Sequence, residues 1–152
     1  MDARETFEGL LAEFNEASGL QAELDERNAA VLELGDVIVN LQLLPESGRV
    51  LAWSTLGFLG DDENADVRLA RLLQFNDRMG ENGGFVFSFD TEDQDRVLAH
   101  DFRPLDFFAD ADVLAAWIEA LVNLVETVRA KLDAECPYVD DGDLEPVVRE
   151  VK

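Results

Sequence analysis

Apolar residues recur at helical spacing in three parts of the chain, residues 4–17, 65–79 and 111–134. The first segment carries one apolar stripe at positions i, i+3, i+4 and i+7, formed by Phe7, Leu10, Leu11 and Phe14. The second segment is apolar over more than one stripe, so it needs burial on more sides than the sheet of a small domain can cover. We therefore expect a second copy of the chain to cover the rest of this helix.

Five other segments have the β-branched content or the alternation that is typical of strands: residues 30–34, 37–44, 50–58, 85–89 and 96–102. The first three are joined by tight turns at Gly35-Asp36 and at residues 45–48, and such short connections permit only antiparallel pairing. The resulting order is α-β-β-β-α-β-β-α. It predicts an α+β fold in which helices pack on an antiparallel sheet.

The chain is strongly acidic, with 34 acidic and 12 basic side chains among 152 residues and a formal net charge of −22. This balance argues against nucleic acid and against anionic membranes as partners, because both need Lys and Arg. It suits a basic partner, or a salt-adapted proteome, since Lys131 and Lys152 are the two lysines. The apolar fraction of 47% is enough for one core. We expect a single domain over residues 1–136 and an acidic, mobile tail over residues 137–152.

Three features of the sequence indicate the cellular compartment. The N-terminus lacks the basic and apolar regions of a signal peptide, and no apolar run approaches the roughly 20 residues of a membrane span. With one cysteine, no disulfide can form within the chain. These features predict a cytoplasmic protein without membrane insertion.

Candidate catalytic and metal-binding residues are few. His100 is the only histidine, and Cys136 has no neighbouring base in the sequence, so both are expected to be ordinary packed side chains. The acidic residues from Asp90 onward do not match a calcium loop, whose sixth position is glycine where this chain has Asp95. We expect no enzymatic activity, no metal and no cofactor.

Two local motifs link this order of elements to a known family. The first helix ends in Gly19-Leu20, and the second ends in the block Leu72-Leu73-Gln74-Phe75-Asn76, which is followed by Gly83-Gly84 and the Phe-rich strand. Over about residues 4–133 the chain resembles the type III secretion effector chaperones, class I, Tir-chaperone-like. The resemblance implies a chaperone that binds the N-terminal region of a secreted effector as an extended chain and keeps it competent for secretion.

The resemblance also implies which residues form the binding surfaces. A homodimer interface maps to Leu69, Leu72, Leu73, Phe75, Phe85 and Phe87. A partner-binding surface maps to Phe7, Leu10, Leu11, Phe14 and Trp53, although the stripe of the first helix is also explained by packing on the sheet. The alternative function is a sensory or regulatory protein-binding domain of the same fold (YbjN-like) without a link to secretion.

Overall fold

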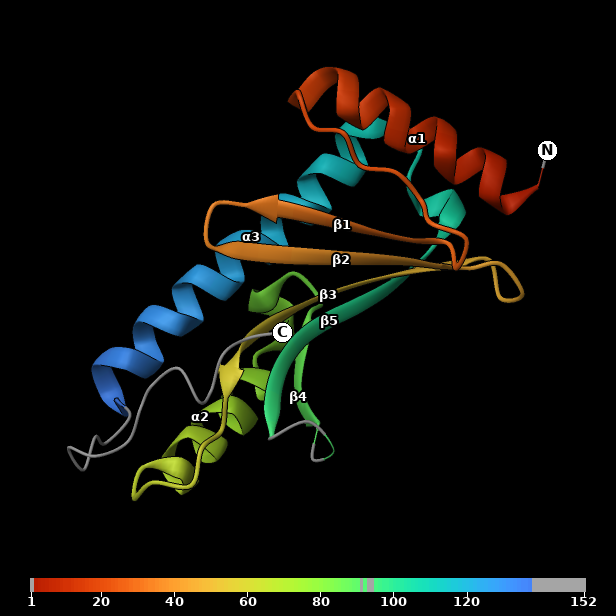
Figure 1. Ribbon diagram of the computed structural model, residues 1–152. Coiled ribbons are helices and arrows are strands. Elements are labelled where there is room, and N and C mark those ends of the chain that lie inside the picture. The colour runs from red at the N-terminus through yellow and green to blue at the C-terminus, as the bar shows by residue number, and fades with distance from the viewer. Residues whose placement is uncertain (1, 91, 93–94, 138–152) are drawn as a thin grey trace. The chain divides into compact units, whose positions relative to one another are not determined.

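The computed structural model describes residues 2–90, 92 and 95–137, so the predicted tail lies outside the described residues from position 138 onward. The elements follow the order α-β-β-β-α-β-β-α, which confirms the predicted fold class (Figure 1). They are α1 (Ala3–Ser18), β1 (Ala29–Leu34), β2 (Val37–Leu44), β3 (Arg49–Phe58), α2 (Ala65–Asp77), η1 (Met79–Asn82), β4 (Val86–Asp90), β5 (Arg96–Pro104), η2 (Leu105–Phe107) and α3 (Ala111–Glu135).

The ends of α1 show why the sequence begins and stops this helix where it does. The Asp2 carboxylate accepts a hydrogen bond of 2.8 Å from the backbone N–H of Glu5, which satisfies a donor in the first turn. Gly19 takes a φ of 79° after the last turn, and its N–H donates to the carbonyl of Asn15. Because both signals lie in the sequence next to the helix, the predicted range of residues 4–17 agrees with α1 to within one residue at each end.

The end of α2 differs more from the prediction. The α-helix stops at Asp77 rather than at residue 79, and after Arg78 the chain forms the 3₁₀ helix η1 (Met79–Asn82). Phe85 precedes β4 instead of opening it, because its N–H donates to the carbonyl of Asn82 in a turn. The 3₁₀ helix η2 was not predicted either, since short 3₁₀ turns leave no apolar period to read.

The strands form a five-stranded antiparallel sheet in the order β1-β2-β3-β5-β4, so β1 and β4 are its edge strands. In the register of β1 with β2, Ala29 lies opposite Gln42 and Leu34 lies opposite Val37. In the register of β2 with β3, Asn40 lies opposite Trp53. The two short turns predicted between these strands therefore set their pairing.

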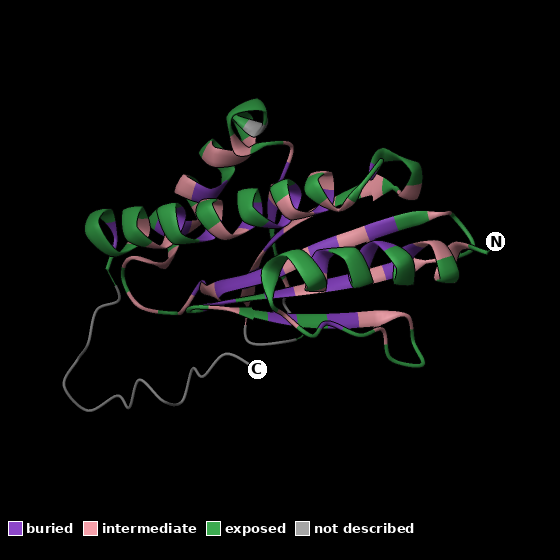
Figure 2. Cartoon of the chain, turned by 90° about the horizontal axis from the view of Figure 1, so that it is seen from above, coloured by how far each residue is buried: buried purple, intermediate pink, exposed green. Residues whose placement is uncertain are grey.

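The chain divides into two compact units, each with a buried core of its own. The first unit comprises Met1–Ser54 and His100–Asn123, and the second comprises Thr55–Ala99 and Leu124–Lys152. In the first unit the buried positions of α1 lie along one side of the helix (Figure 2). Alternate residues of β2 are buried with them: Val37, Val39, Leu41 and Leu43.

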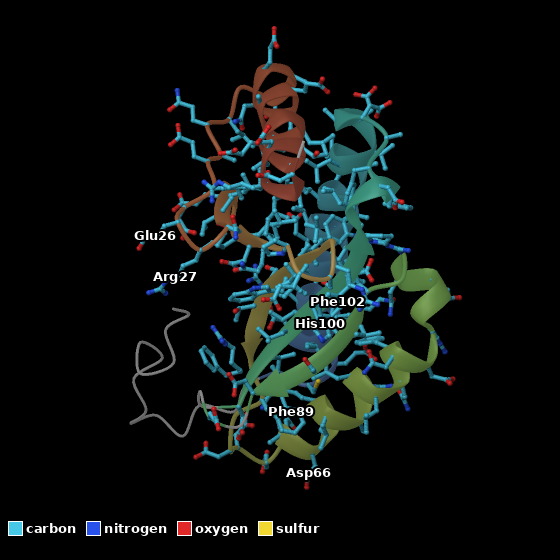
Figure 3. The ribbon with its side chains drawn as sticks, turned by 90° about the vertical axis from the view of Figure 1, so that its right-hand side faces the viewer. Glu26, Arg27, Asp66, Phe89, His100 and Phe102 are labelled. Atoms are coloured by element: carbon cyan, nitrogen blue, oxygen red, sulfur yellow. The ribbon has the colours of Figure 1, made fainter. Side chains whose placement is uncertain are left out.

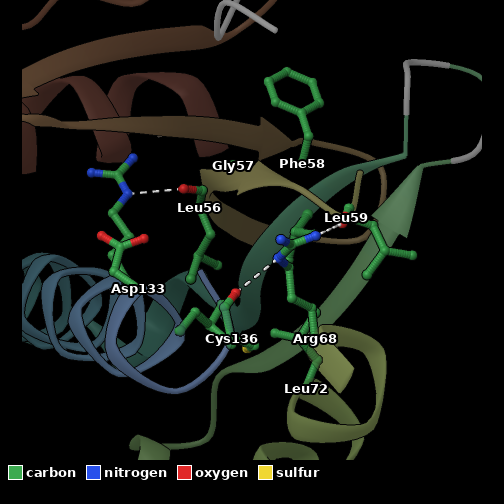
Figure 4. A pocket seen from close by; sticks show the side chains of 11 residues that line it. Leu56, Gly57, Phe58, Leu59, Arg68, Leu72, Asp133 and Cys136 are labelled. Atoms are coloured by element: carbon green, nitrogen blue, oxygen red, sulfur yellow. Dashed lines mark hydrogen bonds between the residues drawn. The ribbon is translucent and has the colours of Figure 1, made fainter. Parts of the chain in front are cut away.

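The second unit has a charged side chain in its interior, because Arg68 of α2 is only 2% exposed. Its guanidinium donates to the carbonyls of Leu59, Cys136 and Pro137 at 2.7, 3.2 and 3.0 Å, two of which are drawn in Figure 4. It also forms a two-point ion pair with the Asp62 carboxylate, with 2.6 Å between Nη2 and Oδ2. Arg68 thus joins the end of β3, the start of α2 and the end of α3 within this unit.

Replacing Arg68 with alanine should destabilise the protein, because it removes the guanidinium from a nearly buried carboxylate and from three carbonyl groups. The expected loss is about 3–5 kcal/mol of unfolding free energy, the usual cost of removing one partner of a buried pair. Urea unfolding measures it. The matched control is Arg71→Ala on the same helix, whose ion pair with Glu135 is about 40% exposed. That pair should contribute under about 1 kcal/mol. Equal losses for the two variants would contradict this role of Arg68.

Candidate partner-binding surfaces

A groove of about 250 Å³ lies between α2 and β4 in the second unit. Seven residues line it: Leu69, Leu72, Leu73, Asn76, Phe87, Ser88 and Phe89. Two of their apolar side chains are exposed to solvent, Leu73 by 62% and Phe89 by 40%. Val67, also on α2, is 41% exposed. The exposed apolar side chains make this groove a candidate binding site.

The groove exists because α2 buries little of its apolar content inside its own unit. Of its residues only Arg68 and Leu72 are buried in the described structure. The buried side of the helix is therefore used largely by a guanidinium that bonds to backbone carbonyls. Leucine and valine side chains on the remaining sides are left facing solvent, which agrees with the excess of apolar residues noted in the sequence.

The six predicted interface residues fall into two groups. Leu72, Phe85 and Phe87 are buried, with exposed fractions of 5%, 0% and 5%, so they belong to the core of the second unit. Leu73 is exposed, and Leu69 and Phe75 are half-buried. The assignment of all six to a dimer interface stays a prediction. The exposed residues are the ones that a second copy could touch without rearrangement.

Asn76, the last residue of the block that carried the resemblance, binds the backbone of an edge strand. Its side-chain amide donates to the carbonyl of Phe87 at 2.9 Å and accepts from the Phe87 N–H at 2.6 Å. An N–H that donates to Asn76 points away from the neighbouring strand β5. The amide of Asn76 therefore occupies the outer edge of β4 as a strand partner would.

The other edge strand, β1, is left open. The N–H of Leu43 donates to the carbonyl of Asn28, so in this register Ala29, Val31 and Glu33 direct their N–H and C=O groups away from β2. Asp25 satisfies both groups of Ala29 through its carboxylate and its N–H. In the described part of the chain, no hydrogen bond reaches the outward groups of Val31 or Glu33.

The predicted partner-binding residues lie mostly in the core of the first unit. The stripe of α1 is buried, with exposed fractions of 0% to 8%, as expected of a helix that packs on a sheet. Trp53 is half-buried and shares a cross-strand row with Asn40 and the 60% exposed Val31. The role of these five residues in binding stays a prediction. The alternation of residues 29–34 could have drawn attention to Val31, which the sequence reasoning missed.

His100 and Cys136 are the two side chains that the sequence raised as candidates for chemistry. His100 lies half-buried on β5 with the exposed Phe102 two residues on, and burial lowers its pKa (Figure 3). Burial raises the pKa of the Cys136 thiol, which disfavours the reactive thiolate. Among the described residues, no group of three or more His, Cys, Asp or Glu side chains is placed to hold a metal ion. No described helix is long and apolar enough to cross a membrane.

Comparison with known proteins identifies the family that this fold and its Asn76 motif indicate. Residues 9–129 match the model of the Tir chaperone protein (CesT) family. The chain belongs to this family. No curated protein sequence matches it.

Several solved structures share the fold of this Tir chaperone family member. The structure of the ExsC–ExsE complex has a TM-score of 0.72 and 24% identity over 86% of this chain and 96% of the other. The structure of the HopA1–SchA chaperone–effector complex has a TM-score of 0.70 and 16% identity over 84% and 96%. The ExoT–SpcS complex from Pseudomonas aeruginosa has a TM-score of 0.59 and 19% identity over 80% and 96%.

Replacing Asn76 with alanine should expose the outer edge of β4. Two hydrogen bonds are lost, and the expected cost is about 2 kcal/mol of unfolding free energy at about 1 kcal/mol for each bond. Hydrogen exchange should show a specific loss of protection at the amide of Phe87. Asn123→Ala, an exposed position on α3, is the control and should leave both quantities nearly unchanged. Unaltered protection at Phe87 would contradict the proposed pairing.

Proposed function

We propose that this protein is a cytoplasmic type III secretion chaperone, which binds the N-terminal region of one effector as an extended chain. Membership of the Tir chaperone family supports this function. Two of its neighbours in fold are the HopA1–SchA chaperone–effector complex and the ExoT–SpcS complex. The observation that carries the proposal for this chain is the open edge of β1. There the N–H and C=O groups of Val31 and Glu33 point away from β2 and have no hydrogen-bond partner among the described residues.

An open sheet edge can bind a client, here the effector, whose N-terminal region is kept unfolded. An extended segment that joins a sheet edge gains main-chain hydrogen bonds, while side chains on alternate positions supply selectivity. A folded client has few free main-chain groups to offer, so binding of this kind favours the extended form. We infer that binding alone performs the task, without catalysis. The regulatory alternative gains no specific support from the described surfaces.

We also propose that the protein is a homodimer and that the groove between α2 and β4 faces the second copy. The exposed Leu73, Phe89 and Val67 support this surface, because they form an apolar patch that a monomer leaves in water. Asn76 supports it as well, since the covered edge of β4 prevents open-ended strand pairing there. The contact between copies would then be made by side chains.

The dimer is tested with a pair of adjacent leucines. Leu73→Asp places a charge on the exposed patch and should convert the dimer to the monomer of 16.9 kDa in light scattering, with an unchanged circular dichroism spectrum. Leu72→Asp places the charge in the core and should unfold the chain. Thr127→Asp, at an exposed position of α3, is the charge control and should remain dimeric. A monomeric wild-type protein at micromolar concentration would refute the proposal.

The client is tested by purification from the host. Tagged protein should retain one dominant partner, and limited proteolysis of that complex should leave a protected stretch near the partner's N-terminus. The reason is that a segment paired with a sheet edge is withdrawn from proteases. Mass spectrometry identifies both the partner and the protected stretch. Several folded partners, or protection spread over a whole folded domain, would favour the regulatory alternative instead.

A further inference from the structure

The open edge of β1 carries two side chains of different chemistry on one face. Val31 and Glu33 are two positions apart, so both point to the same side of the strand, opposite to the buried Ala30 and Leu32. Val31 is 60% exposed, and Glu33 is exposed beside Ile38, its neighbour on β2, which is 43% exposed. A strand added next to β1 would therefore meet an apolar contact and, two residues further, a carboxylate.

The surroundings of this edge add to its negative charge. Exposed carboxylates at Glu23, Asp25 and Glu26 precede β1. Two basic side chains lie beside them, Arg27 of the same segment and Arg4 of α1, whose guanidinium donates to carbonyl groups of this segment. Glu26 and Arg27 project away from the ribbon in Figure 3. The whole chain carries a formal net charge of −22. An approaching segment is attracted if it is basic and repelled if it is acidic.

The same charge disfavours a second copy of the chain as the occupant. Pairing of two β1 edges would bring two equally acidic strands together, with Glu33 and the preceding carboxylates on both sides. Like charges that face each other across strands are destabilising, and a charged residue on an edge strand is a known means of preventing self-association. Opposite charges in the same position stabilise the pair. Glu33 thus permits a basic segment while it discourages another β1.

We propose that Val31 and Glu33 select an extended segment in which an apolar residue and a Lys or Arg lie two positions apart on one face. This inference rests on the proposed function and names the chemistry of the client. The backbone groups of Val31 and Glu33 hold the segment, the Val31 side chain contacts its apolar residue, and the Glu33 carboxylate pairs with its cation. Selectivity between clients then arises at this pair of side chains.

A peptide array tests the preference. Twelve-residue strand peptides carry valine on one face and, two positions further, Lys, Gln or Glu as the test residue. The wild-type protein should bind the Lys series most strongly and the Glu series least, with about three- to tenfold between them at low salt. The difference should shrink at 0.5 M NaCl, since these charges are exposed.

Three variants locate the effect. Glu33→Lys should reverse the order of the series, whereas Glu119→Lys, the same charge change at an exposed position of α3, should keep it. Val31→Pro removes an N–H that points away from β2, so the sheet should stay intact while all three series lose binding. Folding of each variant is checked by circular dichroism.

Each outcome of the peptide array either supports or overturns the inference. Equal binding of the three series, no binding of any series, or an unchanged order in Glu33→Lys would overturn it. A mass of the wild-type protein above that of the dimer, which Val31→Pro reduces to the dimer mass, would show that a second copy occupies the β1 edge. This result would overturn the inference as well. The proposed function is judged separately by the purified complex. An effector protected near its N-terminus without any preference for Lys would leave the chaperone function standing and remove only the selection by Glu33.

Discussion

An antiparallel sheet that does not close into a barrel has two edges, and the outward N–H and C=O groups on each edge need a partner. In this protein the two edges are treated differently. On β4 the amide of Asn76 bonds to both groups of Phe87, so a helix side chain takes the place of a sixth strand. On β1 Asp25 satisfies both groups of Ala29, and among the described residues the outward groups of Val31 and Glu33 have no hydrogen-bond partner. This difference gives the sheet one edge that can receive an extended chain.

The buried Arg68 explains how α2 can hold its place and still present apolar side chains. A helix usually stays on a domain by burying a wide apolar stripe. Here the guanidinium bonds to carbonyls of Leu59, Cys136 and Pro137 and to the Asp62 carboxylate, so much of the attachment is polar. Leu73 and Val67 are then free to face outward. The polar anchor inside the unit and the apolar patch outside it are two consequences of one arrangement.

Local signals predict the helices and strands well, whereas contacts between segments that are distant in the sequence leave no such signal. The bounds of β2 were predicted to the residue, because turns at both ends and β-branched residues between them coincide. Burial of Arg68 could not be foreseen, since arginine is mostly exposed and its carbonyl partners lie up to 69 residues away. Leu72 and Leu73 are identical and adjacent, so only the structure shows that the first is core and the second surface. Alternation in β1 separates Val31 from Ala30, but it does not say which face the rest of the chain covers.

Under the proposed function, backbone and side chains have separate parts in binding a client. Main-chain hydrogen bonds at a sheet edge form with an extended segment of any sequence, so they contribute affinity but not selectivity. The fold is shared with complexes whose sequences are only 16% to 24% identical to this chain, so shared fold leaves the edge side chains free to differ. Glu33 occupies such a position, because its side chain is exposed and its replacement leaves the core untouched. A high negative charge can therefore act as a selective element where it is concentrated at one edge of the sheet.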